Sequence, residues 1–123
     1  MLPKEKLRRE SEYRRCYRQG RRRHGALVSL YFADNPEGET RFGITVGRKV
    51  GKAVVRQRLK RRVREIVRRW PERRELPAMD IVIHLKPAAS TSEFQDLQRE
   101  LQRLLSSLKR RGREASERGR SSS

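Results

Sequence analysis

The sequence predicts a single small α+β domain, a two-layer α/β sandwich in which helices pack on a sheet. Three patterns predict it: apolar alternation at 26–33, an amphipathic helix over about 53–70, and a β-branched run at 80–85 followed by a second amphipathic helix. The domain is expected to occupy 1–112. Residues 113–123 carry no large apolar side chain and are expected to form a disordered basic tail.

The first helix is expected to begin with Ser11 as its N-cap and to end at Gly20. It would carry Tyr13, Cys16 and Tyr17 on one side. Cys16 is the only cysteine, so a disulfide or a cysteine-built zinc site within one chain is excluded. It is expected to be a small buried side chain.

The next segment predicts a strand over 26–33. One face would carry Val28, Leu30 and Phe32, and the other Leu27, Ser29 and Tyr31. The polar residues 34–41 have the composition of a hairpin loop, so 41–48 is expected to be the partner strand. Residues 21–25, between the first helix and this strand, are interpreted as a link.

A basic helix is predicted to start near Ala53 and to end at Pro71. Its apolar residues follow a single helical stripe: Val55, Leu59, Val63, Ile66, Val67 and Trp70. The opposite side carries Gln57, Arg61, Arg64 and Arg68. Gly47 and Gly51 are expected to permit a tight turn from the preceding strand into this helix.

The C-terminal part predicts a central strand at 80–85 and a last helix opened by a capping box of Ser92 and Gln95. The core face of that helix would carry Phe94, Leu97, Leu101, Leu104, Leu105 and Leu108. The order is therefore helix, strand, strand, basic helix, strand, helix.

Charge is the strongest functional signal. The chain has 33 Lys and Arg against 15 Asp and Glu, a net charge of +18. Eleven Lys or Arg and the single acid Glu65 lie between Arg48 and Arg69. A surface of one sign needs an external counter-charge, and a phosphate backbone supplies it. No apolar run is long enough to span a bilayer and the N-terminus lacks a signal-peptide core, so a cytoplasmic protein with no membrane partner is expected.

Enzymatic alternatives find little support in the residues. The segment 47–53 has the wrong spacing for a phosphate-binding loop, and Ala53 stands where a hydroxyl would hold magnesium. Asp80 is the only carboxylate expected on a strand, so neither catalytic residues nor a metal site are expected in the protein. His24 and His84 show no partner pattern. Tyr13, Tyr17 and Tyr31 are either core residues or a stacking platform for single-stranded bases, and the pattern leaves both open.

A family resemblance adds to this interpretation. The motif residues Lys49, Gly51, Ala53, Val54, Arg56, Lys60, Arg61 and Arg64 follow the signature K-x-G-x-A-V-x-R-N-x-x-K-R-x-x-R of the bacterial ribonuclease P protein subunit. The segments YRRCYRQG, LYFADNPEGETRFGITVGRK and DIVIHLKPAAS also resemble that family, with spacing intact over about 5–110. Gln57 departs from the family's Asn, and Tyr13 and Tyr17 from its phenylalanines.

The resemblance implies an α-β-β-(β)-α-β-α order, a four-stranded sheet and a left-handed strand–helix–strand crossover, against the general preference. It implies a protein that binds a catalytic RNA, assists removal of the 5′ leader of precursor tRNA, and leaves the chemistry to Mg²⁺ held chiefly by that RNA, with no small-molecule cofactor. The residues implied to bind the RNA subunit are Arg48, Lys49, Lys52, Arg56, Gln57, Arg58, Lys60, Arg61, Arg64 and Arg68. The residues implied to bind the leader are Tyr13, Tyr17 and Tyr31.

Two alternatives remain beside the resemblance. A structural RNA-binding protein, such as a ribosomal protein, fits composition and fold class equally well, and only the motif at 49–64 separates the two. A protein-only nuclease would cleave RNA with metal alone and needs converging carboxylates that the sequence does not predict.

Overall fold

A computed structural model describes residues 6–7, 9–35 and 38–121, with the backbone alone for 19 and 110–121. The helices are α1 (Glu10–Gln19), α2 (Ala53–Arg69) and α3 (Phe94–Ser121). The strands are β1 (Arg21–His24), β2 (Val28–Asp34), β3 (Arg41–Val46) and β4 (Met79–Leu85). The α+β class, the four-stranded sheet and the order α-β-β-β-α-β-α are confirmed.

The sheet has the order β1-β2-β4-β3. β2 pairs antiparallel with both β1 and β4, whereas β3 pairs parallel with β4. β4 occupies the centre because its residues are apolar on both faces, as a strand covered on two sides requires. The prediction that 80–85 is central is therefore confirmed.

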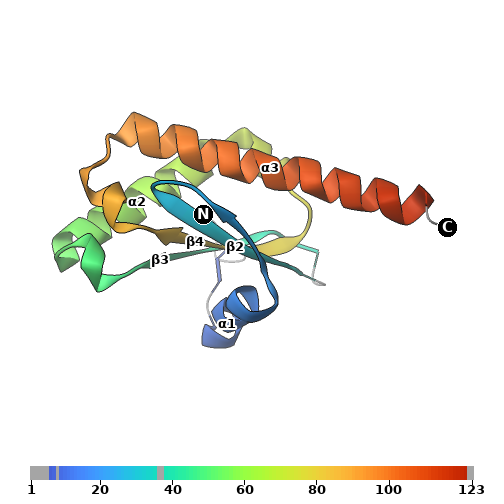
Figure 1. The fold of residues 1–123 in the computed structure, drawn as a ribbon, viewed down its shortest axis with the longest axis horizontal. Coiled ribbons are helices and arrows are strands. Elements are labelled where there is room, and N and C mark those ends of the chain that lie inside the picture. Colours follow the sequence, from blue (N-terminus) through green and yellow to red (C-terminus); the bar gives the residue numbers. More distant parts are fainter. Residues whose placement is uncertain (1–5, 8, 36–37, 122–123) are drawn as a thin grey trace.

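The helices lie on both faces of the sheet (Figure 1). α2 and α3 cover one face and enclose the main core, to which β2 contributes Val28, Leu30 and Phe32. This is the predicted sandwich. α1 adds a partial layer on the other face, over a smaller cluster around Cys16 and Val82.

Two strand predictions were wrong. Residues 28–34 and 41–46 do not form a hairpin, because β4 lies between them. The connection instead crosses the start of β4, where the Asn35 amide N–H donates to the Ala78 carbonyl oxygen at 3.3 Å. Residues 21–24, interpreted as a link, form β1 and pair in register with 29–32. A short run of Arg and His on an edge strand has no apolar alternation to reveal it.

The starts of two helices differ from the prediction. α1 begins at Glu10 with Arg9 as N-cap rather than Ser11, since the Glu12 carboxylate accepts the Arg9 backbone N–H at 2.8 Å. The Ser92 hydroxyl donates to the Ala89 carbonyl oxygen at 2.8 Å instead of capping α3. The end of α2 at Arg69, before Pro71, and of α1 before Gly20 agree with the sequence.

α3 continues as helix to Ser121, through the segment for which the sequence predicts a disordered tail. Its last residues include Arg, Glu and Ala, which have high helix propensity, and Glu114 stands four residues before Arg118. The last core residue of α3 among the described side chains is Leu108. A domain boundary at 112 stays a prediction.

Candidate nucleic-acid interface

The outer face of α2 and the turn before it form a basic surface. α2 directs Leu59, Val63 and Ile66 into the core, and the helical period therefore turns its cations outward. We define the basic surface as Arg48, Lys49, Lys52, Arg56, Arg58, Lys60, Arg61, Arg62 and Arg64. All ten positions implied to bind an RNA subunit lie on α2 or the turn before it, with Gln57 exposed among them.

The charges of this surface are not neutralised from within the chain. Arg68 donates to both oxygens of Glu65 at 2.8 and 2.9 Å, and Arg69 pairs with the same carboxylate at 2.9 Å. The hydrogen bond from Arg68 lowers the pKa of Glu65. In the described part of the chain no ion pair involves the nine cations of the basic surface. An external polyanion is the partner that such a surface lacks.

The turn into α2 depends on one glycine. Gly51 has φ +153° and its N–H donates to the Arg48 carbonyl oxygen at 3.2 Å. A side chain would be strained at this φ and would meet Val55 at 3.3 Å. Gly47, by contrast, has an ordinary φ of −74° and open space around it, so the expected need for glycine applies to Gly51 only.

A second surface lies where α1 crosses the sheet. The rings of Tyr17 and Tyr31 pack with centroids 4.7 Å apart at 53°. His24 and His84 flank Tyr31 with centroids at 6.3 and 6.5 Å, both edge-on. We call these four residues the tyrosine cluster. Tyr17 is 38% exposed, so the cluster is open to a ligand ring rather than sealed as core.

Hydrogen bonds hold the cluster from below. His24, Ser29, His84 and Thr45 are aligned in register across the four strands. His24 Nδ1 is 2.8 Å from Ser29 Oγ, and His84 Nδ1 is 2.8 Å from Thr45 Oγ1. Thr45 Oγ1 is also 3.0 Å from the Tyr17 hydroxyl. Burial raises the pKa of Tyr17, and burial together with Lys86 lowers the pKa of His84, so both rings are neutral at pH 7.

Tyr13 is set apart from the cluster. Its ring lies against Gly43, where an added Cβ would come within 2.5 Å of it, and its hydroxyl donates to the Leu7 carbonyl oxygen at 3.4 Å. Burial raises its pKa, and the positive charge of Arg64 opposes that rise. Of the three predicted leader residues, the structure therefore brings together the rings of Tyr17 and Tyr31, while the ring of Tyr13, on the same helix as Tyr17, lies against Gly43 of β3.

Asp80 fastens α1 to the sheet. Its carboxylate is fully buried and accepts two hydrogen bonds from Arg41, at 2.8 and 2.9 Å. Arg15 of α1 and the Asn35 side chain also donate to it, at 2.5 and 2.9 Å. A carboxylate with four donors from three segments is structural, and it fixes the helix that carries Tyr17.

Comparison with known proteins decides the family. The family model described as Ribonuclease P matches residues 1–116. The chain belongs to the ribonuclease P protein family. A "Ribonuclease P protein component" from Acidothermus cellulolyticus is 39% identical over 112 residues, covering 88% of this chain and 92% of its own length. The one from Thermus oshimai is 41% identical over 103 residues, 84% of this chain.

The Thermus relatives extend beyond the part that this chain matches. This chain spans 64% of the Thermus oshimai protein and 50% of those from Thermus thermophilus. Among solved structures, the RNase P protein from Thermotoga maritima has a TM-score of 0.73 at 31% identity, covering 82% of this chain and 94% of its own. That from Staphylococcus aureus has a TM-score of 0.76 at 25% identity, covering 83% and 93%.

In this ribonuclease P family member, sequence reasoning missed the two histidines and the role of Asp80. His24 and His84 are 60 residues apart, and only the strand register reveals that both flank Tyr31. The signal for Asp80 was its place at the start of the most apolar strand, where a charge must be paired. Among the described residues no group of three or more His, Cys, Asp or Glu is arranged to hold a metal ion.

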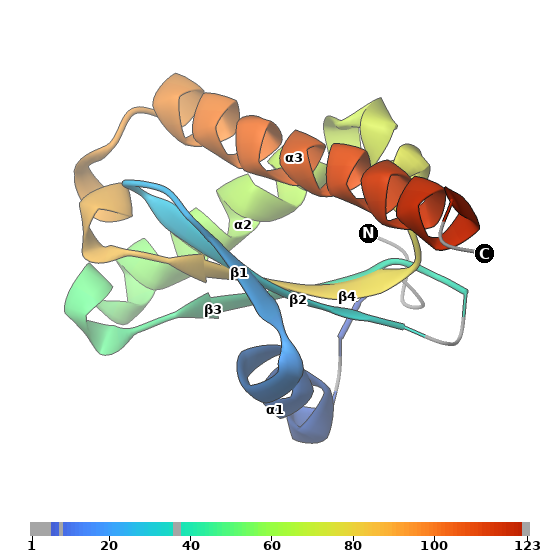
Figure 2. The same ribbon diagram turned by 45° about the vertical axis from the view of Figure 1, so that its right-hand side comes forward.

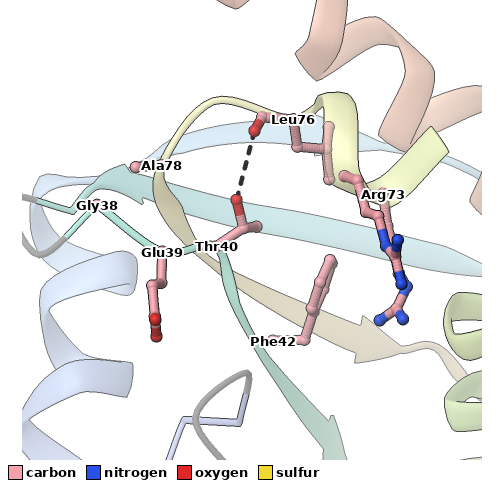
Figure 3. Close-up of a pocket in the computed structure, with 8 residues that line it drawn as sticks. Gly38, Glu39, Thr40, Phe42, Arg73, Leu76 and Ala78 are labelled. Carbon is pink, nitrogen blue, oxygen red and sulfur yellow. Dashed lines mark hydrogen bonds between the residues drawn. The ribbon is translucent and has the colours of Figure 1, made fainter. Parts of the chain in front are cut away.

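A hollow of about 300 Å³ lies at the start of β3, far along the strand from Thr45 (Figure 3). It is bounded by Gly38, Glu39, Thr40, Phe42, Arg73, Arg74, Leu76 and Ala78. At its edge the Thr40 hydroxyl donates to carbonyl oxygens of the loop before β4, those of Pro77 at 3.0 Å and Leu76 at 3.5 Å. These hydrogen bonds join the residue before β3 to the loop before β4. No helix in the described residues is long and apolar enough to span a membrane.

Proposed function

We propose that this chain is the protein subunit of a ribonuclease P, a ribonucleoprotein that removes the 5′ leader of precursor tRNA. The basic surface of α2 would bind the RNA subunit, and the tyrosine cluster would stack bases of the leader. One observation carries the proposal: nine cations without an internal counter-charge lie on α2 and the turn before it, the segment that bears the family motif, in a chain that matches the family over 1–116.

The division into two surfaces rests on their different chemistry. The basic surface offers guanidinium and ammonium groups, which contact phosphates regardless of sequence. The tyrosine cluster offers ring faces and the polar edges of His24 and His84, which suit unpaired bases. A leader is single-stranded, whereas a large folded RNA presents mainly backbone, so each surface fits one of the two partners.

The catalytic Mg²⁺ is assigned to the RNA subunit. Asp80 does not fit the ion, because Arg15, Arg41 and Asn35 already occupy its oxygens. Glu12 is held by Arg41 at 2.6 Å. Mg²⁺ takes carboxylates together with several waters, and these guanidinium-bound carboxylates offer no such site. The residues of this chain would position the RNA and the leader, and Mg²⁺ on the RNA would activate the attacking water. A cytoplasmic location stays part of the proposal.

The test is to purify the protein from its host under mild salt and to sequence the RNA that accompanies it. We expect one large RNA, and we expect the pair to release the leader from precursor tRNA in Mg²⁺. Association with ribosomal RNA alone, without leader removal, would mean that the chain is a structural RNA-binding protein. The Arg61→Glu variant, purified in the same way, should carry less RNA than the wild type.

A further inference from the structure

A groove separates the edge strand β1 from α3. Figure 2 shows β1 at the front of the sheet, with α1 below it and α3 above. The groove has a volume of about 550 Å³ and is lined by Arg22, Arg23, His24, Arg103, Leu104 and Ser107. Neither the basic surface nor the hollow of Figure 3 shares any of these residues.

The groove is cationic and lacks an internal anion. In the described residues Arg22, Arg23 and Arg103 form no ion pair, and no carboxylate lines the walls. Arg23 Nε is buried without a hydrogen-bond partner. The nearest carboxylate along α3, Glu100, is occupied by the backbone N–H groups of residues 26–28 at 2.8 to 2.9 Å. A buried donor without an acceptor within the chain is free to bind an external oxygen.

The backbone of β1 adds further donors. The Gly25 N–H donates to the Val28 carbonyl oxygen at 2.8 Å, so this pair is hydrogen-bonded across the turn. Antiparallel pairs alternate, and the backbone groups of Arg22 and His24 therefore face away from β2, towards the free edge. Guanidinium and backbone N–H groups together are the set of donors that holds a phosphate.

The groove is continuous with the tyrosine cluster. His24 belongs to both, since its ring lies 6.3 Å from that of Tyr31 and its side chain also lines the groove. Arg22 is the cross-strand partner of Tyr31 on the same face of the sheet. We propose that the groove between β1 and α3 binds the phosphate backbone of the leader where it runs beyond the bases stacked on Tyr17 and Tyr31. This inference rests on the proposed function.

The leader fits the groove better than the other occupants do. An extended peptide could pair with the edge of β1, but arginines on an edge strand disfavour such pairing. The RNA subunit is assigned to α2, which borders β3 at the opposite edge of the sheet. A single strand that leaves the tyrosine cluster past His24 reaches β1 without crossing any other element.

The experiment compares precursor tRNAs with no leader, a short leader and a long leader, bound to the reconstituted holoenzyme over a salt series. In the wild type, affinity should rise with each lengthening. In the Arg22→Glu/Arg103→Glu variant the gain from the long leader should disappear, while the short leader and the RNA subunit bind as before. The salt slope for the long leader should fall by about 0.7 for each phosphate that the groove no longer neutralises, as for single strands.

The matched control is Arg74→Glu, a charge reversal at an exposed residue outside the groove, and circular dichroism melting checks that each variant is folded. The proposal is overturned if the double variant weakens short and long leaders equally. It is also overturned if that variant weakens RNA-subunit binding or behaves like Arg74→Glu. If the wild type itself binds precursor and mature tRNA equally, the proposed function fails, and this inference fails with it.

Discussion

Tyr31 is the residue on which the leader hypothesis depends most. It contacts Tyr17 and both histidines, and its place on β2 is fixed by pairing on either side. Such a ring can be removed without exposing the main core, which lies on the other face of the sheet. Replacing Tyr31 by alanine therefore tests RNA binding more than folding.

We expect Tyr17→Ala and Tyr31→Ala to weaken precursor tRNA binding by roughly 1–3 kcal/mol per stacked base, because each removes a stacking face. Mature tRNA, which has no leader, should bind almost as before. Titration of holoenzyme with both tRNAs measures the difference. If the variants weaken the two tRNAs equally, the rings are only part of the core and the cluster is not a leader site.

Charge reversal on the basic surface should act on the other partner. Arg61→Glu and Arg64→Glu are expected to weaken assembly with the RNA subunit and to lower its salt slope by up to about 0.9 for each phosphate that is no longer neutralised. Arg61 is the cleaner test, because Arg64 also acts electrostatically on Tyr13. Titration with the RNA subunit over a salt series provides the measurement. Unchanged assembly by both variants would contradict the assignment of this surface.

His84 should make stability depend on pH. Its folded pKa is lowered by burial and by Lys86, so the unfolded chain binds the proton more readily. The contribution of His84 is therefore complete above the unfolded pKa of about 6.5 and is lost as pH falls through the folded pKa. Urea unfolding at pH 7.5 and 5.5 should show a larger loss in the wild type than in His84→Gln. Equal losses in the two proteins would mean that the pKa of His84 does not differ between the folded and the unfolded chain.

At the scale of elements, the buried charge of Asp80 helps to dock α1 on the sheet. Asp80→Asn keeps the shape but removes the buried anion that Arg15 and Arg41 share, and we expect a cost of about 3 kcal/mol in unfolding free energy. Cys16, buried beside it with a pKa raised by burial to about 11, should become reactive to thiol reagents as α1 loosens.

The matched control is Glu10→Gln, which removes an exposed pair with Arg14 at 3.0 Å on the same helix and should change little. Urea unfolding and thiol reaction rates measure both variants. An Asp80→Asn protein as stable as Glu10→Gln, with Cys16 still protected, would show that the carboxylate does not hold α1.

The end of α3, in contrast to Asp80, is expected to contribute little to stability. The core residues among its described side chains end at Leu108, so deletion of 113–123 should leave the melting temperature nearly unchanged. RNA affinity should fall only modestly, through the removal of Arg113, Arg118 and Arg120. Thermal unfolding of the truncated chain measures the first effect. A large drop in melting temperature would contradict the placement of the domain boundary near 112.

The sequence predicts the elements that have a strong apolar periodicity. It does not predict the features that depend on which strands pair with one another. The apolar stripe that ends at Trp70 and the β-branched run at 80–85 predicted α2 and β4 nearly to the residue. The strand β1, the insertion of β4 between β2 and β3, and the row of His24, Ser29, His84 and Thr45 depend on the strand register. A single sequence does not reveal the register, because alternation says which face a residue occupies but not which strand lies beside it.

At the scale of the whole molecule, the sheet separates two binding chemistries. α2 borders β3 on one side of the sheet, with its cations outward, and α1 crosses the other side with the tyrosine cluster exposed. The contacts of Asp80 with Arg15 and Arg41 fix the second surface relative to the first. Under the proposed function, two RNA segments would therefore be held at the same time in a fixed relation, and the protein would position the leader against the RNA subunit.

The same arrangement predicts that the protein alone does not cleave RNA. Among the described residues, the carboxylate most shielded from solvent, Asp80, is surrounded by guanidinium groups, and neither histidine has a carboxylate partner to activate it as a base. We expect RNA-free protein in Mg²⁺ to leave precursor tRNA intact, while the same preparation restores leader removal when the RNA subunit is added. Gel analysis of end-labelled precursor measures both. Cleavage by the RNA-free protein at a rate near that of the reconstituted complex would move the chemistry onto the protein and overturn the assignment of Mg²⁺ to the RNA.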